Sequence, residues 1–214
     1  MSQEPTTGEP GAATAARAAV VLASASRARR TLLENAGVAA RSEASGVDEE
    51  ELKRSLKAAS AQVDEAAATL AELKARKVSL RHGGALVIGA DQILECGGRW
   101  FDKPRNLAQA RADLEALSGR EHSLVSAVAV VRDGVLLWQR RERARLVMRT
   151  LSGAFIAGYL ASVGPAACDW VGAYQLEGLG AQLFERIEGD YFTILGLPLL
   201  PLLDFLRHHG AVPT

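Results

Sequence analysis

Cysteine, long apolar runs and any excess of charge are what this sequence has little of. Cys96 and Cys168 are its only cysteines, too few for a disulfide framework or a four-thiolate metal site, so we expect reduced, packed thiols. No apolar run reaches the length of a membrane span. The 25 basic residues balance 25 acidic ones, whereas a general nucleic-acid binder usually carries a basic excess. We therefore expect no membrane partner and no nucleic-acid polymer.

The first residues differ in composition from the rest of the chain. Residues 1–17 are rich in Ala, Gly, Pro, Thr and Glu, and they lack the apolar middle of a secretory signal, so we predict a disordered tail. The length of 214 residues suits one domain, with 48% hydrophobic and 23% charged residues, which are ordinary values for a globular protein. We predict one domain over residues 18–214.

Apolar periodicity and turn residues predict an α/β fold. Short apolar or β-rich runs predict strands, and apolar positions spaced three or four residues apart predict helices. The predicted strands are 18–25, 85–90, 124–131, 135–139, 145–150 and 182–188. The predicted helices are 31–37, one long helix from the acidic run 47–51 to about residue 73, 107–117, a helix from a Ser152 cap to about 162, and a last helix ending at 208–210. Strands and helices mixed in this way indicate an α/β fold.

Polar residues gather where the first strand meets the first helix. Ser24 and Ser26 lie at the strand end, and Arg29 and Arg30 follow. Helix N-termini expose unpaired N–H groups and favour anions, and serines with arginines complete a phosphate cradle. The alternative is a capping serine with solvated arginines.

Asp91 follows the apolar run 85–90, and Lys103 stands beside Pro104. In open α/β sheets, sites form outside the carboxyl ends of strands, where a carboxylate holds Mg²⁺ or activates water. Proline stiffens the loop that presents Lys103 as a point charge for phosphate. A turn aspartate and a solvated lysine are the alternatives.

The remaining titratable residues give weaker patterns. The four histidines have no zinc-like spacing, and His122 reads as a strand-edge residue. Lys74 and Arg76 lie on the predicted long helix, whose charged face we expect to be solvated. From local pattern alone, none of these residues is a candidate for chemistry.

Taken together and in order, the motifs resemble those of the Maf family. The resemblance runs from about residue 20 to the C-terminal helix. It rests on Leu22-Ala23-Ser24-Ala25-Ser26 with Arg29-Arg30, Val47-Asp48-Glu49, Leu70-Ala71 with Lys74, Gly89-Ala90-Asp91, Lys103-Pro104, Leu117-Ser118-Gly119 with His122, Gly172-Ala173-Tyr174, Glu188-Gly189-Asp190 and Gly196-Leu197-Pro198.

This resemblance implies a fold, an activity and a set of site residues. It implies a Maf/inosine-triphosphatase-like mixed sheet with two lobes flanking a nucleotide cleft. It also implies a cytoplasmic enzyme, often a homodimer, that hydrolyses a nucleoside triphosphate to monophosphate and pyrophosphate with Mg²⁺ or Mn²⁺. By position, Asp91 matches the catalytic aspartate and Glu49 an acidic metal partner. The family's phosphate contacts match Ser24, Arg29, Lys74 and Lys103.

Three positions resemble the branch that acts on 7-methyl-GTP. Ala28 stands where the dTTP and UTP branch has arginine, Gln92 where it has threonine, and Glu177 where it has glutamine. A carboxylate accepts hydrogen bonds from the guanine N1–H and amino group and favours a cationic methylated ring. Arg27 departs from the branch, which has proline there, and Gly172-Ala173-Tyr174 is closer to the dTTP branch. The alternatives are a dTTP/UTP pyrophosphatase and a non-catalytic nucleotide-binding regulator of septum formation.

Overall fold

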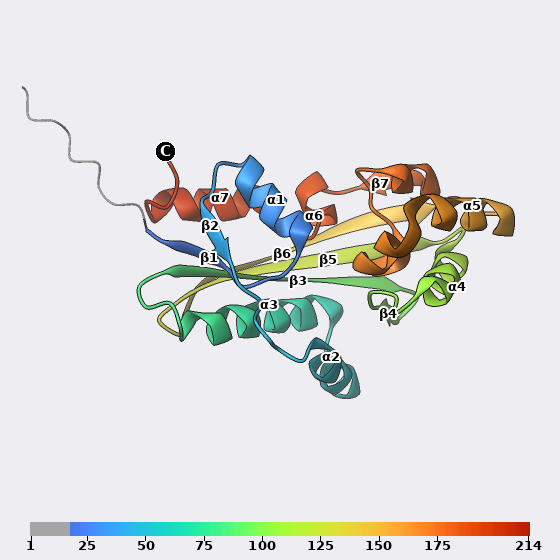
Figure 1. The fold of residues 1–214 in the computed structure, drawn as a ribbon. Helices are drawn as coiled ribbons and strands as arrows, with labels where there is room; N and C mark the ends of the chain where they lie inside the picture. The colour runs from blue at the N-terminus through green and yellow to red at the C-terminus, as the bar shows by residue number, and fades with distance from the viewer. Residues whose placement is uncertain (1–17) are drawn as a thin grey trace, which may run out of the picture.

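A seven-stranded mixed sheet forms the centre of the computed structural model, which describes residues 18–214 (Figure 1). The tail predicted for residues 1–17 lies outside the described residues. The strands are β1 (Val20–Leu22), β2 (Ala40–Ser42), β3 (Leu86–Cys96), β4 (Arg99–Phe101), β5 (Glu121–Arg132), β6 (Val135–Met148) and β7 (Phe184–Glu188). Their order is β2-β1-β3-β5-β6-β7, and β4 pairs with the end of β3.

The sheet changes from parallel to antiparallel at its centre. Strands β2, β1 and β3 are parallel, and β3, β5, β6 and β7 are antiparallel neighbours. Leu22, the last residue of β1, pairs with Ile88, so β3 runs eight residues beyond the end of β1. This step in the sheet leaves room beside the middle of β3.

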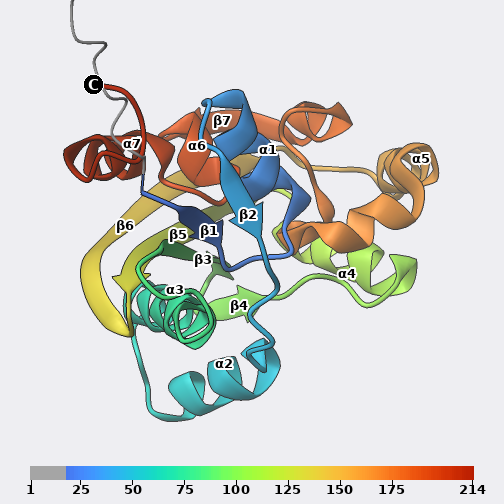
Figure 2. The same ribbon diagram turned by 60° about the vertical axis from the view of Figure 1, so that its left-hand side comes forward.

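Helices cover both faces of the sheet, and a further group of helices lies at its far end. On one face lies α3 (Val63–Ser79), and α2 (Glu49–Ala58) projects beyond it on the same side (Figures 1 and 2). The other face carries α1 (Arg27–Asn35), α6 (Tyr191–Ile194) and α7 (Leu199–His208). At the far end of the sheet lie α4 (Leu107–Leu117), α5 (Gly153–Val163) and the 3₁₀ helices η1 (Gly164–Asp169), η2 (Val171–Ala173) and η3 (Leu179–Leu183).

Two groups of buried apolar residues correspond to the two lobes that the resemblance implies. One group joins α1 and α7 to β1, β3 and β5 and includes Leu33, Ile88 and Leu202. The other joins α4, α5 and the 3₁₀ helices to the far ends of β3, β5 and β6 and includes Leu114 and Leu146. The α/β class and the two-lobed mixed sheet are therefore confirmed. No helix within residues 18–214 combines the length and hydropathy needed to cross a bilayer.

Several predicted elements are confirmed, and three are wrong. The helix over 107–117 and the Ser152 cap are as expected, since Ser152 Oγ accepts a hydrogen bond from the Phe155 N–H. The predicted long helix is two helices, because the chain turns at Ser60, whose φ of 56° lies in the left-handed region. The two strands predicted at 135–139 and 145–150 are one strand, β6, because the residues between them continue the pairing with β5 and their charged side chains are exposed or half-buried.

The third correction concerns Asp91, which does not follow its strand. Strand β3 continues through Asp91 to Cys96, and Asp91 pairs with Ala127 of β5. The strand continues because Ile93, Leu94 and Cys96 are buried and packed. Asp91 instead lies just past the end of the neighbouring strand β1.

Candidate functional site

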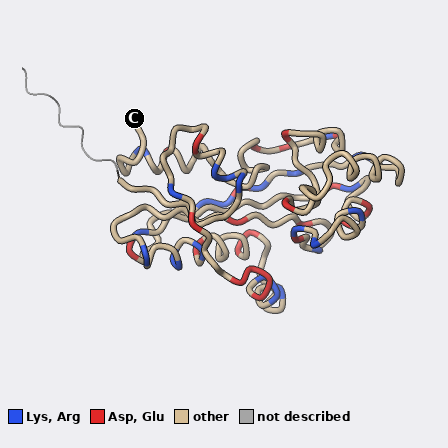
Figure 3. Tube along the Cα trace, in the orientation of Figure 1, with Lys and Arg blue, Asp and Glu red and all other residues tan. Residues whose placement is uncertain are grey.

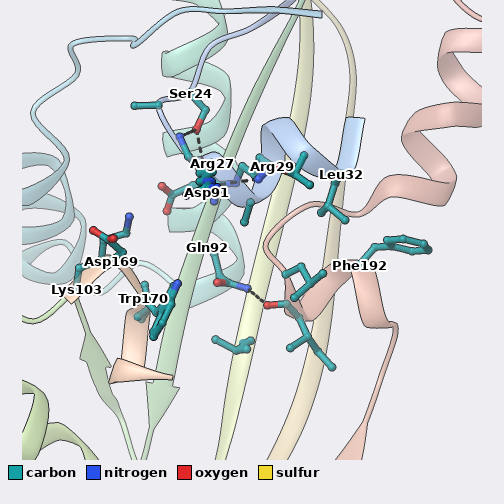
Figure 4. A pocket seen from close by; sticks show the side chains of 18 of the residues that line it. Ser24, Arg27, Arg29, Leu32, Asp91, Gln92, Lys103, Asp169, Trp170 and Phe192 are labelled. Atoms are coloured by element: carbon teal, nitrogen blue, oxygen red, sulfur yellow. Dashed lines mark hydrogen bonds between the residues drawn. The ribbon is translucent and has the colours of Figure 1, made fainter. Parts of the chain in front are cut away.

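A large pocket, with a volume of about 1480 Å³, opens between the two lobes (Figure 4). Asp91 and Gln92 lie in the middle of the close-up, with Lys103, Asp169 and Trp170 on one side and Leu32 and Phe192 on the other. Its lining comes from parts of the segments 23–36, 44–53, 166–177 and 191–203, together with Lys74, Asp91, Gln92, Asp102, Lys103 and Leu124. The pocket thus brings together the predicted site residues except Arg30, which is exposed and pairs with Glu34 along α1.

Asp91 and Glu49 share one buried lysine. Lys74 Nζ on α3 lies 2.6 Å from Asp91 Oδ1 and 2.7 Å from Glu49 Oε1. Asp91 is 2% exposed and its Oδ2 has no hydrogen-bond partner within residues 18–214, whereas the Glu49 side chain is 45% exposed. Burial acts to raise the pKa of Glu49, but the positive charges of Lys74, Lys53 and Arg29 together lower it. The expectation of a solvated Lys74 is therefore wrong, because the helix turns this side chain toward the sheet.

The close approach of α3 to β3 depends on Gly89. A Cβ at Gly89 would lie 2.0 Å from the Ala71 carbonyl oxygen and 2.9 Å from Ala75 Cβ. Ala71 and Ala75 are fully buried, and Lys74 lies on the same helix between them. The missing side chain on the strand and the small side chains on the helix let Lys74 reach Asp91.

Arg29 ties three segments together at the start of α1. Its Nε donates to the Gly196 carbonyl oxygen at 2.8 Å, and its Nη1 donates to the Ala90 carbonyl oxygen at 2.9 Å and to Ser24 Oγ at 3.4 Å. Burial lowers its pKa, and the carboxylates of Asp91 and Glu49 act against that shift. Gly196 has a φ of 91°, so a side chain there would be strained. Arg29 is thus fixed beside Asp91, and Ser26 caps α1 by accepting from the Arg29 N–H.

Lys103 lies on the short loop between β4 and α4, in the lining of the pocket. Its side chain is exposed and stands near Asp169 (Figure 4). Partial desolvation lowers its pKa, as do the positive charges of Arg29 and Lys74. Arg29, Lys74 and Lys103 all line the same pocket.

Lys53 and Asp102 belong to this site, although the sequence did not single them out. Lys53 is 9% exposed, and its Nζ lies 2.8 Å from Asp102 Oδ1. Burial acts to lower the pKa of Lys53, but Asp91, Asp102 and Glu49 together raise it. The available signal was spacing, since Lys53 follows Glu49 by four residues and therefore lies one helical turn away on the same face.

The three specificity candidates also line the pocket, in different surroundings. The amide nitrogen of Gln92 donates to Ser126 Oγ and to the carbonyl oxygens of Thr193 and Ile194, at 2.9–3.1 Å. Glu177 is exposed and accepts from Gln175 Nε2 at 2.8 Å. Ala28 is half-buried on the first turn of α1. Gln92 therefore has only its carbonyl oxygen left for a ligand.

A buried histidine supports the loop that carries Glu177. His122 is 2% exposed, and its Nε2 lies 2.9 Å from the hydroxyl oxygen of Tyr174. Tyr159 donates to the carbonyl oxygen of Ala173, whose φ of 62° is unusual for a side chain with Cβ. Burial lowers the pKa of His122 to about 4. His122 is the second residue of β5, near the end of the strand as expected, and the far lobe covers this end of β5.

Basic and acidic residues are both distributed over the described part of the chain (Figure 3), and the pocket lining contains residues of both signs. Its lining has five cationic side chains and six carboxylates. The cations are Arg27, Arg29, Lys53, Lys74 and Lys103, and the carboxylates are Glu49, Glu50, Asp91, Asp102, Asp169 and Glu177. No cluster of three or more His, Cys, Asp or Glu side chains arranged to hold a metal occurs in residues 18–214.

Comparison with known proteins gives one consistent family. The nucleoside triphosphate pyrophosphatase of Paramagnetospirillum magneticum is 55% identical over 192 residues, which cover 90% of this chain and 99% of the relative. The 7-methyl-GTP pyrophosphatase of Rhizobium johnstonii is 53% identical over 193 residues, 90% of this chain and 97% of the relative. The nucleoside triphosphate pyrophosphatase of Hyphomonas neptunium is 52% identical over 196 residues, 92% of this chain and 98% of the relative.

The family model for Maf-like protein matches residues 19–209, nearly the whole of the described chain. The matched region contains both lobes and every residue of the lining described above. The chain belongs to the Maf-like protein family.

Proposed function

We propose that this protein is a nucleoside triphosphate pyrophosphatase, which releases a nucleoside monophosphate and pyrophosphate. The observation that carries the proposal is the buried Asp91 carboxylate, which Lys74 holds through one oxygen while the other has no partner in the described chain. An unpartnered carboxylate oxygen in a pocket is suited to accept a proton from water. Relatives that are 50–55% identical carry names of this activity.

The proposed reaction uses five polar residues of the pocket. Asp91 accepts a proton from water, and the resulting hydroxide attacks the α-phosphorus. The bond from the α-phosphorus to the oxygen that bridges it to the β-phosphorus breaks, and pyrophosphate leaves with that oxygen. Arg29, Lys74 and Lys103 neutralise the charge that develops on the departing phosphates. Ser24 orients Arg29 by accepting its hydrogen bond.

Charge balance supports a requirement for Mg²⁺ or Mn²⁺. The lining has one more carboxylate than cations, so a triphosphate with its negative charges would enter a pocket with no positive excess. Mg²⁺ is typically held by one or two carboxylates together with substrate phosphates, and Asp91 and Glu49 are two such carboxylates beside one ammonium. When bound, the metal would lower the pKa of a coordinated water and screen the phosphates.

We further propose 7-methyl-GTP as the preferred substrate. Glu177 places a carboxylate at the pocket lining, and a carboxylate suits the donors and the positive charge of a 7-methylguanine ring. Relatives from Rhizobium johnstonii and Rhizobium meliloti, 53% and 51% identical, are named 7-methyl-GTP pyrophosphatases. The competing candidates are dTTP and UTP, which the Gly172-Ala173-Tyr174 loop favours. We also propose that the protein acts in the cytoplasm as a homodimer.

A substrate panel tests these proposals directly. Purified protein is incubated with 7-methyl-GTP, dTTP, UTP and GTP, with Mg²⁺, with Mn²⁺ and with a chelator. The products are identified by chromatography. We expect the monophosphate and pyrophosphate, the highest kcat/KM with 7-methyl-GTP, and loss of turnover with chelator. Higher kcat/KM with dTTP or UTP would reject the substrate assignment. Binding without turnover in the presence of metal would instead favour a nucleotide-binding regulator.

A further inference from the structure

The Lys53 ammonium is buried in the pocket wall, yet the proposed reaction does not use it. Its side chain is 11% exposed, and its Nζ donates a hydrogen bond to Asp102 Oδ1 at 2.8 Å. Asp102 is half-exposed at 51% and stands directly before Lys103 in the chain. An ion pair with one desolvated partner fixes geometry better than one that is exposed on both sides. The pair therefore joins α2 to the loop that presents Lys103.

A second ion pair joins α2 to the same loop, and its loop residue, Arg105, does not line the pocket. Arg105 Nη2 lies 3.2 Å from Glu50 Oε2, and these side chains are 80% and 66% exposed. One turn beyond Lys53, Lys57 lies over the ring of Trp100 at 5.0 Å. Variants that break these two contacts serve as controls, because the contacts link α2 to its neighbours without involving Lys53 or Asp102.

We propose that Lys53 is a positioning residue, which holds the 102–105 loop against α2 through Asp102 so that Lys103 faces the phosphates. The proposal rests on the proposed function for what Lys103 contacts, but the linkage itself is a property of the protein alone. Glu49 and Lys53 lie one turn apart on α2. One helix therefore sets both the Glu49 contact to Lys74 and the placement of Lys103.

A direct contact between Lys53 and phosphate is the rival arrangement. The charges of Asp91 and Glu49 act to raise the pKa of Lys53. Lys53 is therefore close enough to the reacting centre for a direct phosphate contact to be tested. The observed ion pair favours the positioning role, because a phosphate ligand would first have to displace Asp102 from the ammonium. The two arrangements differ in what happens when Asp102 is changed.

Kinetics of the intact protein separate the two roles. We expect Lys53→Met and Asp102→Asn each to lower kcat/KM about 10–100-fold, the size that a misplaced catalytic charge produces. The double variant should be no worse than either single one, since both break one contact. Lys53→Arg, which keeps a charged donor, should restore most of the loss, and Arg105→Gln and Lys57→Met should match the wild type. A silent Asp102→Asn beside an impaired Lys53→Met would overturn the proposal.

A second measurement needs no turnover. The chain has only five lysines, at positions 53, 57, 74, 77 and 103, so ¹³C-lysine labelling gives a simple spectrum in which Lys103→Arg assigns the Lys103 signal. The lowered pKa of Lys103 reflects desolvation and the proximity of Arg29 and Lys74. If the loop swings away in Lys53→Met or Asp102→Asn, the pKa of Lys103 should rise, and it should stay lowered in Lys57→Met.

The two readouts distinguish failure of this inference from failure of the proposed function. If the wild type hydrolyses nucleotides but the pKa of Lys103 is unchanged in Lys53→Met, the positioning role is rejected and the proposed function stands. If the wild type hydrolyses no nucleotide but the pKa of Lys103 is raised in Lys53→Met, the positioning role is supported and the proposed function is rejected.

Discussion

Replacing Gly89 with alanine tests how closely α3 must lie against the sheet for the site to form. The new Cβ would lie 2.0 Å from the Ala71 carbonyl oxygen, 2.8 Å from the Ala75 nitrogen and 2.9 Å from Ala75 Cβ. All three atoms belong to a helix whose side chains are buried here, so no flexible side chain can move aside. Because real Cβ contacts essentially never fall below 3.0 Å, the helix or the strand must shift by about 1 Å.

That shift has a stability cost and a functional one. Overpacking a well-packed core typically costs about 1–3 kcal/mol, which corresponds to a fall in Tm of roughly 2–12 °C for a chain of this size. Lys74 moves with α3, and its 2.6 Å contact with Asp91 does not survive a displacement of about 1 Å. A misplacement of that size costs about 100-fold in rate, so we expect turnover to fall by that factor in the protein that remains folded.

Thermal and urea unfolding, followed by circular dichroism, measure the first effect, and pyrophosphate release well below the Tm measures the second. Gly158→Ala is the matched control, since Gly158 lies within α5 with no atom within 4 Å of an added Cβ. This control should gain about 0.5–1 kcal/mol from better helix propensity and keep its activity. A Gly89→Ala protein with the wild-type Tm and turnover would refute the argument that this glycine sets the distance between α3 and β3.

Three further predictions concern single side chains of the site and of its support. Asp91→Asn should lower turnover about 10²–10⁴-fold in the protein that remains folded, because an amide cannot accept the proton; normal pyrophosphate release would contradict this. Burial lowers the pKa of His122 to about 4, so the wild type should lose about 2–3 kcal/mol of unfolding free energy as the pH falls from about 6.5 toward 4.5. The loss arises because protons bind the unfolded state preferentially in this pH range, and His122→Phe should not show it. If urea titrations give the same pH dependence of the unfolding free energy for the wild type and His122→Phe, this explanation is ruled out. Glu177→Gln should lower the preference for 7-methyl-GTP over dTTP by about 10–100-fold in kcat/KM, the worth of a charged hydrogen bond, and an unchanged ratio would show that Glu177 does not read the base.

The sequence was most informative where a local pattern has one structural solution. The helix over 107–117 has apolar residues at regular spacing and a terminal stop, and it forms as predicted because little else competes for those residues. The Ser152 cap is equally local, since a serine oxygen needs only the N–H three residues later. Both features are decided within a few residues of the chain.

It was least informative where a charged residue is neutralised by a distant partner. Asp91 looked like the end of a strand because an aspartate inside a buried strand is costly without a partner. That partner, Lys74, comes from a helix that is 17 positions earlier in the chain. The charged run 140–143 separated two predicted strands for the same reason, although it continues β6 with its side chains directed alternately to the two faces of the sheet. Pairing and exposure are tertiary properties, and local patterns do not contain them.

The turn between α2 and α3 shows how one such tertiary detail produces the site. Were residues 49–74 a single helix, as their apolar spacing suggested, a rise of about 1.5 Å per residue would separate Glu49 from Lys74 by roughly 37 Å. Instead Ser60 adopts a left-handed conformation, α2 leaves the line of α3, and Glu49 Oε1 lies 2.7 Å from Lys74 Nζ. The same turn brings Lys53 to Asp102. Two ion pairs that an unbroken helix would forbid thus depend on a single backbone conformation, and with them the pairing of a second carboxylate to the lysine that holds Asp91.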